Sequence, residues 1–232
     1  MVILMEKGKA YQTGCDLLYG RISGVPDPDA AFQYFLRAAF EGDSVAMVRL
    51  GRICEERRDF GNAYFWYNEA ALSGFDAGLY EVAYMYHRGL YVRQDYGKAR
   101  EYFEKVFEAG CWQAAYFLGL YYQNGYGVEK DYVSAFRYYR EGADHGDGLC
   151  AVNLGIIYCD GWYTRKDPEH GFELFMLGCR AHEPIAFANA GRCCEKGIGT
   201  AKNLEKATAL YREGAELGEE NCAEALKRLR SE

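Results

Sequence analysis

The sequence repeats itself, with a period of 36 residues over most of the chain and 32 at its start. Each repeat has an Asp or Asn, a small residue four positions later and an aromatic ring four positions beyond that. The polar residues are Asp27, Asp59, Asp95, Asp131, Asp167 and Asn203. The small residues are Ala31, Ala63, Ala99, Ala135, Gly171 and Ala207, and the rings are Phe35, Tyr67, Phe103, Tyr139, Phe175 and Tyr211. Self-similarity with a period of 20–50 residues indicates an architecture built from stacked units.

These features predict the second helix of each unit. Asp or Asn ahead of an apolar-periodic run is a helix N-cap, and Pro28 and Pro168 occupy the first helical position, where a missing N–H costs nothing. The small residue and the ring lie on one helical face. A recurring glycine then ends the helix in the left-handed conformation. It stands at Gly42, Gly74, Gly110, Gly146 and Gly218, with His182 in its place in the fifth unit.

A first helix precedes each of these and has its own pattern. An apolar residue followed by a small one lets two helices approach closely, and a ring or a thiol comes three residues later. The small residues are Gly51, Ala83, Gly119, Gly155 and Gly191, and the later residues are Cys54, Tyr86, Tyr122, Tyr158 and Cys194. Gly89, Gly125, Gly161 and Gly197 are predicted to close this helix.

The stretch NGYGVEKD at residues 124–131 could be mistaken for a phosphate-binding loop. A dinucleotide fingerprint needs a third glycine where Lys130 stands, and it needs a preceding strand, whereas the preceding residues have helical spacing. Gly125 is therefore predicted to cap a helix, and we expect this loop to bind no nucleotide.

The fourth unit resembles the Sel-1-like repeat family, a relative of the tetratricopeptide repeats. The resemblance covers about residues 9–220. It rests on Ala114, Leu118, Gly119, Tyr122, Gly125, Gly127, Val128, Asp131, Ala135, Tyr138, Tyr139, Ala143 and Gly146. Two departures stand out. The first two units lack four residues in the connector, between Ile22 and Asp27 and between Cys54 and Asp59, and the fifth has Trp162-Tyr163 at the loop glycine and valine.

The expected fold is all-α: a right-handed superhelical solenoid of about six antiparallel helix pairs. The pairs are predicted at residues 9–43, 44–76, 77–111, 112–147, 148–184 and 185–220. Residues 221–231 repeat only the first-helix pattern and are predicted to form a C-terminal capping helix. Because each repeat contacts only its neighbours, the chain, 1–232, is expected to be a single repeat domain.

Composition excludes several classes of protein. The net charge is −7, whereas a nucleic-acid groove needs a concentrated basic face. No apolar run approaches the roughly 18 residues of a membrane span. The opening MVILM is shorter than a secretory core and has no preceding basic residue. We therefore expect a cytoplasmic protein, with no membrane insertion and no nucleic-acid partner, that acts as a monomer.

The nine cysteines are expected to be thiols, most of them buried, because their number is odd and no C-x-x-C occurs. Several fall in packing slots: Cys150 and Cys222 in that of Ala114, and Cys179 in that of Ala143. The family has a secreted, cysteine-rich branch with a disulfide in each repeat, and this chain lacks that regularity. With only four histidines, we expect no metal site and no cofactor.

The resemblance places a binding surface on the first helices, because these line the concave groove in tetratricopeptide relatives. Transferred by register, the groove positions carry rings and aliphatic side chains at the centre, asparagines beyond them and arginines at the ends. They are Tyr80, Tyr84, Tyr116, Phe117, Leu120, Ile156, Asn153, Asn189, Arg52 and Arg192. Such a groove predicts binding of an extended segment of about 8–12 residues. The alternative is that neighbouring superhelical turns or long side chains cover part of this surface.

The predicted function is a protein–protein interaction adaptor or scaffold, as Sel-1-like proteins commonly are in degradation complexes and in bacterial signalling and host contact. No G-x-S-x-G or H-E-x-x-H motif occurs, so no catalytic residue is predicted. Two alternatives stay open. One is a hydrolase, since the cysteine-rich branch has been linked to β-lactam binding, and the other is a repeat protein with no specific ligand.

Overall fold

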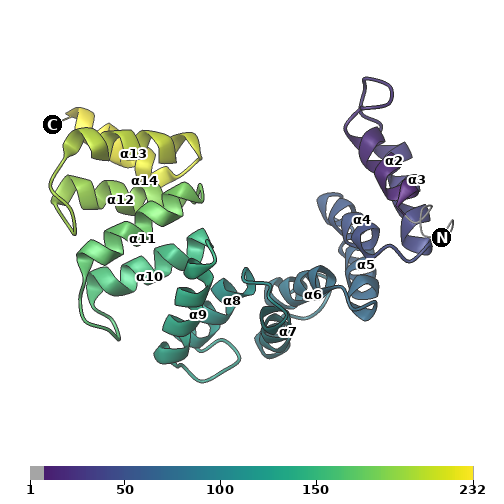
Figure 1. Cartoon of the computed structure of the whole chain (residues 1–232), viewed down its shortest axis with the longest axis horizontal. Coiled ribbons are helices and arrows are strands. Elements are labelled where there is room, and N and C mark those ends of the chain that lie inside the picture. Colours follow the sequence, from purple (N-terminus) through teal and green to yellow (C-terminus); the bar gives the residue numbers. More distant parts are fainter. Residues whose placement is uncertain (1–7, 232) are drawn as a thin grey trace. The chain divides into compact units, whose positions relative to one another are not determined.

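The computed structural model describes residues 8–231, and the regular elements in that range are all α-helices (Figure 1). They alternate between the first and second helix of each repeat. The helices are α2 (Lys9–Leu18), α3 (Pro28–Phe40), α4 (Ser44–Glu56), α5 (Phe60–Leu72), α6 (Asp76–Arg88), α7 (Tyr96–Glu108), α8 (Ala114–Asn124), α9 (Tyr132–Asp144), α10 (Gly148–Asp160), α11 (Pro168–Arg180), α12 (Pro184–Lys196), α13 (Leu204–Glu216) and α14 (Glu220–Ser231).

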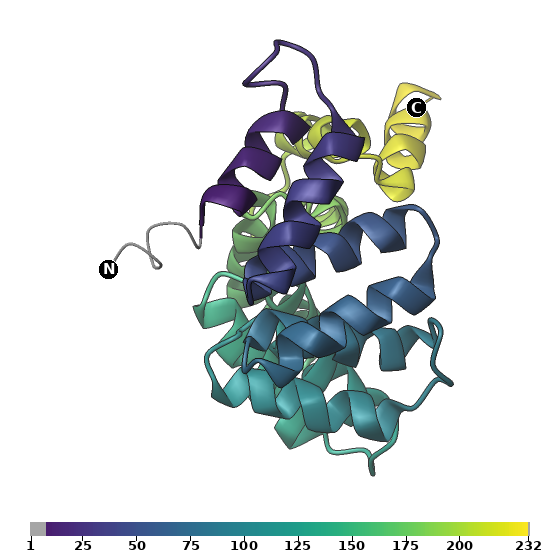
Figure 2. The same ribbon diagram turned by 90° about the vertical axis from the view of Figure 1, so that its right-hand side faces the viewer.

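Contacts divide these helices into two compact units, with the boundary between Cys111 and Trp112. In unit 1, α2 packs on α3, α4 on α5 and α6 on α7, and each pair also contacts the next one (Figure 2). In unit 2, α8 to α13 form three pairs in the same way, and α14 packs on α13 and α12. The all-α solenoid with six helix pairs and a capping helix is therefore confirmed, while a single domain over 1–232 stays a prediction.

The N-caps are where the sequence predicts them. The Asp27 carboxylate accepts the Ala30 N–H at 2.9 Å, and Asp95 accepts the Lys98 N–H at 3.0 Å. Asn203 does the same with an amide oxygen, which accepts the Lys206 N–H at 2.8 Å. Each such bond satisfies one of the orphan N–H groups at a helix start.

The helix ends also follow the prediction. Gly42, Gly74, Gly110, Gly146 and Gly218 all have φ between 79° and 97°. His182, which replaces the glycine in the fifth repeat, has φ 58° and keeps the left-handed conformation in spite of its side chain. In the opening loop Gly125 has φ 75°, and its N–H donates to the Tyr121 carbonyl at 2.8 Å. This glycine is the predicted helix cap.

The small residue of the first helix gives room to the ring of the second. A Cβ on Gly51 would lie 2.3 Å from the Tyr67 ring, and one on Gly119 would lie 2.4 Å from the Tyr139 ring. The same contact recurs at Gly14, Gly155 and Gly191. In the third repeat an alanine, Ala83, stands at this position. Five of these rings are among the largest fully buried side chains of the described core and Tyr211 is 3% exposed, and the two helices of a pair meet on them.

The first repeat corrects one expectation. In five repeats the N–H of the second-helix N-cap donates to the first-helix carbonyl of Cys54, Tyr86, Tyr122, Tyr158 or Cys194. In the first repeat the Asp27 N–H donates to Leu17 at 3.0 Å, and Gly14 contacts the Phe35 ring. Leu17, rather than Ile22, is thus the equivalent residue, and this connector is long. Only the second repeat has the short turn.

The fifth repeat departs from the pattern at Trp162-Tyr163, as predicted, but in a different register. Tyr163 has φ 61° and stands at the place of Gly127, which has φ 65°, so Thr164 rather than Tyr163 replaces the valine. The Tyr163 ring stacks on Tyr132 with centroids 4.0 Å apart. Tyr91 holds the same backbone conformation in the third repeat, with φ 62°.

All nine cysteines lie among the described residues as free thiols, and six are buried, which confirms the expected burial. Cys150 and Cys222 are packing residues: a Cβ on Gly142 or Gly214 would lie within 2.5 Å of their sulfurs. Over residues 8–231, no helix has both the length and the apolar character that a membrane crossing needs. The same range has no cluster of three or more His, Cys, Asp or Glu side chains placed to hold a metal ion.

Candidate functional site

The ten predicted binding residues are divided between the two units, and all lie on first helices. Arg52 lies on α4 and Tyr80 and Tyr84 on α6, in unit 1. The others belong to α8, α10 and α12 of unit 2. None of the ten is fully buried: Arg52 and Arg192 are exposed and the rest are half-buried.

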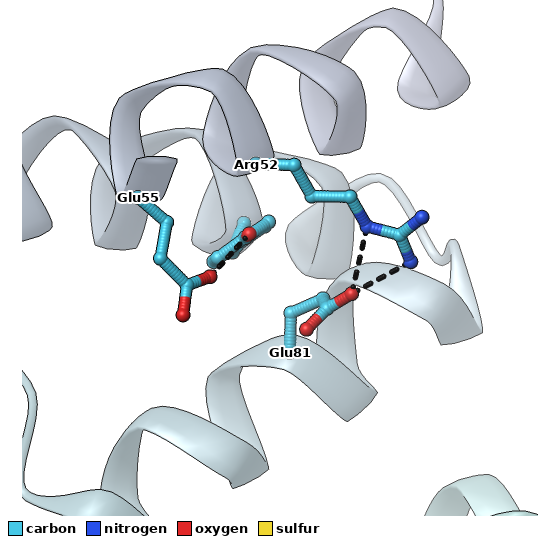
Figure 3. Close-up of polar contacts among 4 residues, drawn as sticks. Arg52, Glu55 and Glu81 are labelled. Carbon is cyan, nitrogen blue, oxygen red and sulfur yellow. Dashed lines mark hydrogen bonds and ion pairs between the residues drawn. The ribbon is translucent and has the colours of Figure 1, made fainter. Parts of the chain in front are cut away.

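In unit 1, Arg52 is held by the chain itself. Its Nε and Nη2 atoms both donate to Glu81 Oε1, at 3.1 and 2.8 Å, across the contact between α4 and α6 (Figure 3). Burial raises the pKa of Glu81, although the guanidinium opposes that rise. An acidic partner residue would have to displace Glu81 from Arg52.

A second polar contact lies beside this pair. The Tyr67 hydroxyl donates to Glu55 Oε2 at 2.9 Å (Figure 3). Tyr67 is fully buried, and burial is the main reason why its pKa is raised. Glu55 therefore supplies the acceptor that this buried hydroxyl needs.

The two tyrosines of α6 have different neighbours. Tyr80 meets the buried Phe103 ring edge to face, with centroids 5.4 Å apart. Tyr84 lies beside Arg88, whose guanidinium carbon is 5.9 Å from the ring centroid, and 6.1 Å from the His87 ring. Burial lowers the pKa of His87. Tyr80 thus packs against the core, whereas Tyr84 lies among cationic and aromatic neighbours.

In unit 2 the predicted residues come together, because α8 contacts α10 and α10 contacts α12. We call the surface that they form the α8–α10–α12 face. Its members are Tyr116, Phe117, Leu120, Asn153, Ile156, Asn189 and Arg192. The Tyr116 and Phe117 rings meet edge to face at 5.3 Å between centroids. The structure therefore gathers seven of the ten predicted residues on the first helices of three successive repeats.

Both asparagines of this face use one amide N–H on their own helix. Asn153 Nδ2 donates to the Leu149 carbonyl at 2.8 Å, and Asn189 Nδ2 donates to the Ile185 carbonyl at 3.0 Å. Arg192 donates to Asn189 Oδ1 at 3.0 Å. These bonds fix the orientation of the amides. Asn153 keeps a carbonyl oxygen and a second N–H for a partner.

The face ends in a hollow of about 340 Å³. It lies where α12, α13 and α14 meet, and it includes two of the predicted residues, Asn189 and Arg192. Its lining is Ile185, Ala188, Asn189, Arg192, Tyr211, Asn221 and Ala225. The hollow has apolar walls and a few polar groups, as small binding sites generally do.

The two ends of the face differ in charge. Burial raises the pKa of Tyr116, and the nearby Cys150 thiol and Asp147 and Glu183 carboxylates raise it further. The exposed Arg192 lies toward the other end, near the end of α12. The Tyr116 end therefore favours a cation and the Arg192 end an anion.

One register position was missed by the sequence analysis. It directly follows the ring or thiol of the first helix and carries Glu55, His87, Gln123, Cys159 and Glu195 in the second to sixth repeats. Glu55 and Glu195 accept the hydroxyls of Tyr67 and Tyr211, at 2.9 and 2.8 Å. The signal was present in the sequence, because the last four of these residues are spaced by 36. It needed the structure to show what they face.

The comparisons with known proteins agree with this arrangement. Six copies of the Sel1 repeat match the chain, at residues 10–43, 44–75, 76–111, 112–147, 148–181 and 185–219. The chain therefore belongs to the Sel1 repeat family. No protein of curated function matches it in sequence.

Solved structures share the fold. One is c5321, described as a protective antigen of uropathogenic Escherichia coli strains with an SLR fold, at 30% identity and a TM-score of 0.77. The match covers 96% of this chain and 48% of c5321, so the chain spans about half of that protein. A Sel1 repeat protein from Oxalobacter formigenes has 21% identity and a TM-score of 0.77, over 94% of this chain and 86% of its own. A Klebsiella pneumoniae Sel1 repeat protein has 23% identity and a TM-score of 0.58, over 86% and 99%.

Proposed function

We propose that the chain is a non-catalytic adaptor that binds a protein partner through an extended peptide on the α8–α10–α12 face. Sel1 repeat proteins generally act as scaffolds for protein interactions. The observation that carries the proposal for this chain is the set of half-buried rings and oriented amides on three contacting helices.

The length of the segment follows from helix spacing. Packed helices lie about 8–10 Å apart, so three of them span about 16–20 Å. An extended chain covers about 3.3 Å per residue, so about 6 residues fit across this face. A longer segment of about 8–12 residues, as the sequence suggests, would also need contacts beyond these three helices.

The chemistry of the face defines the preferred peptide. Tyr116, Phe117 and Ile156 offer apolar contacts for one or two large side chains. Asn153 can hold the peptide backbone, since its amide is already oriented by the Leu149 carbonyl. A basic residue suits the end near Asp147 and Glu183, and an acidic residue suits the end at Arg192. In unit 1, Tyr84 is the corresponding candidate contact.

The test is a random dodecapeptide display library screened on the immobilised chain, followed by titration of the selected peptides. We expect Tyr116→Ala to weaken binding by about 2 kcal/mol, because anchoring rings dominate such interfaces. Asn153→Ala should weaken it as well. The matched control is Val133→Ala on the second helix α9, at a side chain that is 76% exposed, and it should leave binding unchanged.

Urea unfolding of each variant separates binding from stability. Tyr116→Ala should unfold at nearly the wild-type urea concentration, since the ring is only half-buried. Peptides that bind Tyr116→Ala and Asn153→Ala as tightly as wild type, but lose affinity for Val133→Ala, would move the binding surface to the second helices. A library that yields no binder would contradict the proposal.

A further inference from the structure

Two thiols and three cations line one pocket of unit 2. The pocket has a volume of about 500 Å³ and lies between the ends of α10 and α12. Cys159 comes from α10 and Cys193 from α12. Lys166, Arg192 and Lys196 supply positive charge, against one carboxylate, Asp160. The packing slots that explain Cys150 and Cys222 do not explain this pair.

The two thiols differ in accessibility. Cys159 is half-buried, whereas Cys193 is only 2% exposed and forms the inner wall. A hydrogen bond from Cys193 lowers the pKa of Cys159, and Arg192 and Lys166 lower it further, against burial and Asp160. The same bond, together with burial, raises the pKa of Cys193. Cys159 is therefore the nucleophile of the pair, since the thiolate is the reactive form.

The backbone around Cys159 makes room for its sulfur. A Cβ on Gly171 of α11 would lie 2.4 Å from Cys159 Sγ. The other described repeats have alanine at this register position, from Ala31 to Ala207. The fifth repeat thus has a sulfur where the second and sixth have Glu55 and Glu195, and a glycine beside it.

From this geometry we propose that the pocket is a thiol–disulfide exchange site for a small anionic disulfide of the glutathione class. The three cations attract the carboxylates of the disulfide, and Cys159 lies within the pocket to meet its sulfur. Cys193 then completes the exchange from the inner wall. The site goes beyond the peptide-binding function and does not depend on it.

The reaction balances in two steps. The Cys159 thiolate attacks one sulfur of the disulfide RSSR, so that a Cys159–SR bond forms, the RS–SR bond breaks and RS⁻ leaves with the electron pair. Cys193 Sγ then attacks Cys159 Sγ, forming the Cys159–Cys193 disulfide and expelling the second RS⁻. The proton of Cys193 and the proton that Cys159 released on ionising go to the two leaving thiolates. In sum, two protein thiols are oxidised and one RSSR is reduced to two RSH.

The experiment exposes the whole chain to oxidised glutathione and maps the products by mass spectrometry after non-reducing digestion. Wild type should form the Cys159–Cys193 disulfide. Cys193→Ser should instead retain one glutathione on Cys159, and Cys159→Ser should leave Cys193 unmodified. Cys15, which is half-buried as well, is the internal reference thiol, and Cys159 should react on the order of tenfold faster.

A double variant, Lys166→Gln with Lys196→Gln, tests the role of the cations. It should slow the reaction with oxidised glutathione on the order of tenfold, because electrostatic attraction raises the encounter rate. It should slow the neutral bis(2-hydroxyethyl) disulfide much less, because with that reagent only the loss of the Lys166 contribution to the lowered pKa of Cys159 counts. Arg192 stays in place because it also lines the hollow of the α8–α10–α12 face. Equal rates at Cys15 and Cys159, a wild-type product without a Cys159–Cys193 link, or no difference between the two disulfides would overturn the proposal.

Discussion

The second and fourth repeats, residues 44–75 and 112–147, bury a tyrosine at the same register position but differ in the hydrogen bonding of its hydroxyl. Tyr67 and Tyr139 are both fully buried, and each ring lies over a first-helix glycine. The Tyr67 hydroxyl donates to Glu55, whereas the Tyr139 hydroxyl has no hydrogen-bond partner within residues 8–231. Gln123 stands at the register position of Glu55. Equivalent backbones therefore do not guarantee that equivalent buried polar groups are satisfied.

The sixth repeat supports this interpretation. Tyr211 donates to Glu195 at 2.8 Å, and Arg228 of the capping helix donates to the same carboxylate oxygen at 2.8 Å. The bond with Arg228 is the main reason why the pKa of Glu195 is lowered. An acid at this one register position thus decides whether the buried hydroxyl has an acceptor.

The largest expected effect tests what the two repeats share. Gly51→Ala and Gly119→Ala should each lower the free energy of unfolding by about 2–3 kcal/mol, because the new methyl group would overlap the tyrosine ring. Urea denaturation measures both. Ala83→Gly in the third repeat is the control and should cost only about 1 kcal/mol, from helix propensity. A much smaller loss at Gly119 than at Gly51 would mean that the two repeats do not pack alike.

The next effect is specific to the second repeat. Glu55→Leu should cost about 2 kcal/mol of unfolding free energy, since it leaves the Tyr67 hydroxyl buried without an acceptor. Glu55→Gln should cost less, because its amide oxygen can still accept. The counterpart in the fourth repeat, Gln123→Leu, should change stability by only a few tenths of a kcal/mol. Equal losses at residues 55 and 123 would mean that the comparison is wrong.

Removing the two hydroxyls should change stability in opposite directions. Tyr67→Phe should cost about 1 kcal/mol, because it breaks a hydrogen bond and leaves the Glu55 carboxylate without its donor. Tyr139→Phe should raise stability by about 1 kcal/mol, because it removes a buried hydroxyl that has no hydrogen-bond partner within residues 8–231. Thermal and urea unfolding of the two single variants decide the question. A loss in both would show that Tyr139 has an acceptor.

The smallest effect compares the connectors of the same two repeats. Arg58 in the short turn and Gly125 in the long loop both have left-handed backbones, with φ 60° and 75°. Arg58→Gly should gain up to about 0.5 kcal/mol by relieving strain, and Gly125→Ala should lose about 1 kcal/mol. Chemical denaturation with repeated measurements resolves such differences. A gain at both positions would contradict the role of Gly125 as a helix cap.

The sequence predicted most of the fold because its signals are local. An aspartate cap, a ring eight residues later and a closing glycine act within one helix, so Asp95, Phe103 and Gly110 define α7 almost by themselves. The register failed in the first repeat, where Ile22 was aligned by its distance from Asp27, and by one residue in the loop of the fifth, where Thr164 rather than Tyr163 replaces the valine. Leu17 is the true equivalent, because the connector there is longer.

The candidate site shows the limit of such reasoning. Register was enough to predict that Tyr116, Asn153 and Asn189 lie on first helices, and these helices do contact one another in unit 2. Register says nothing about what a side chain meets on the next helix. Arg52 is 29 residues from Glu81, and the structure joins them.

What the sequence alone determined, then, is the repeat: helix starts, helix ends and the small residue under each ring, because these follow from a pattern that recurs along the chain. Only the tertiary structure decided which side chains of successive helices meet. It pairs Arg52 with Glu81, gives the Tyr139 hydroxyl no hydrogen-bond partner among the described residues and brings Cys159 to Cys193 in one pocket. The physical reason is that stacking brings together residues about one repeat apart, and no local preference records that encounter.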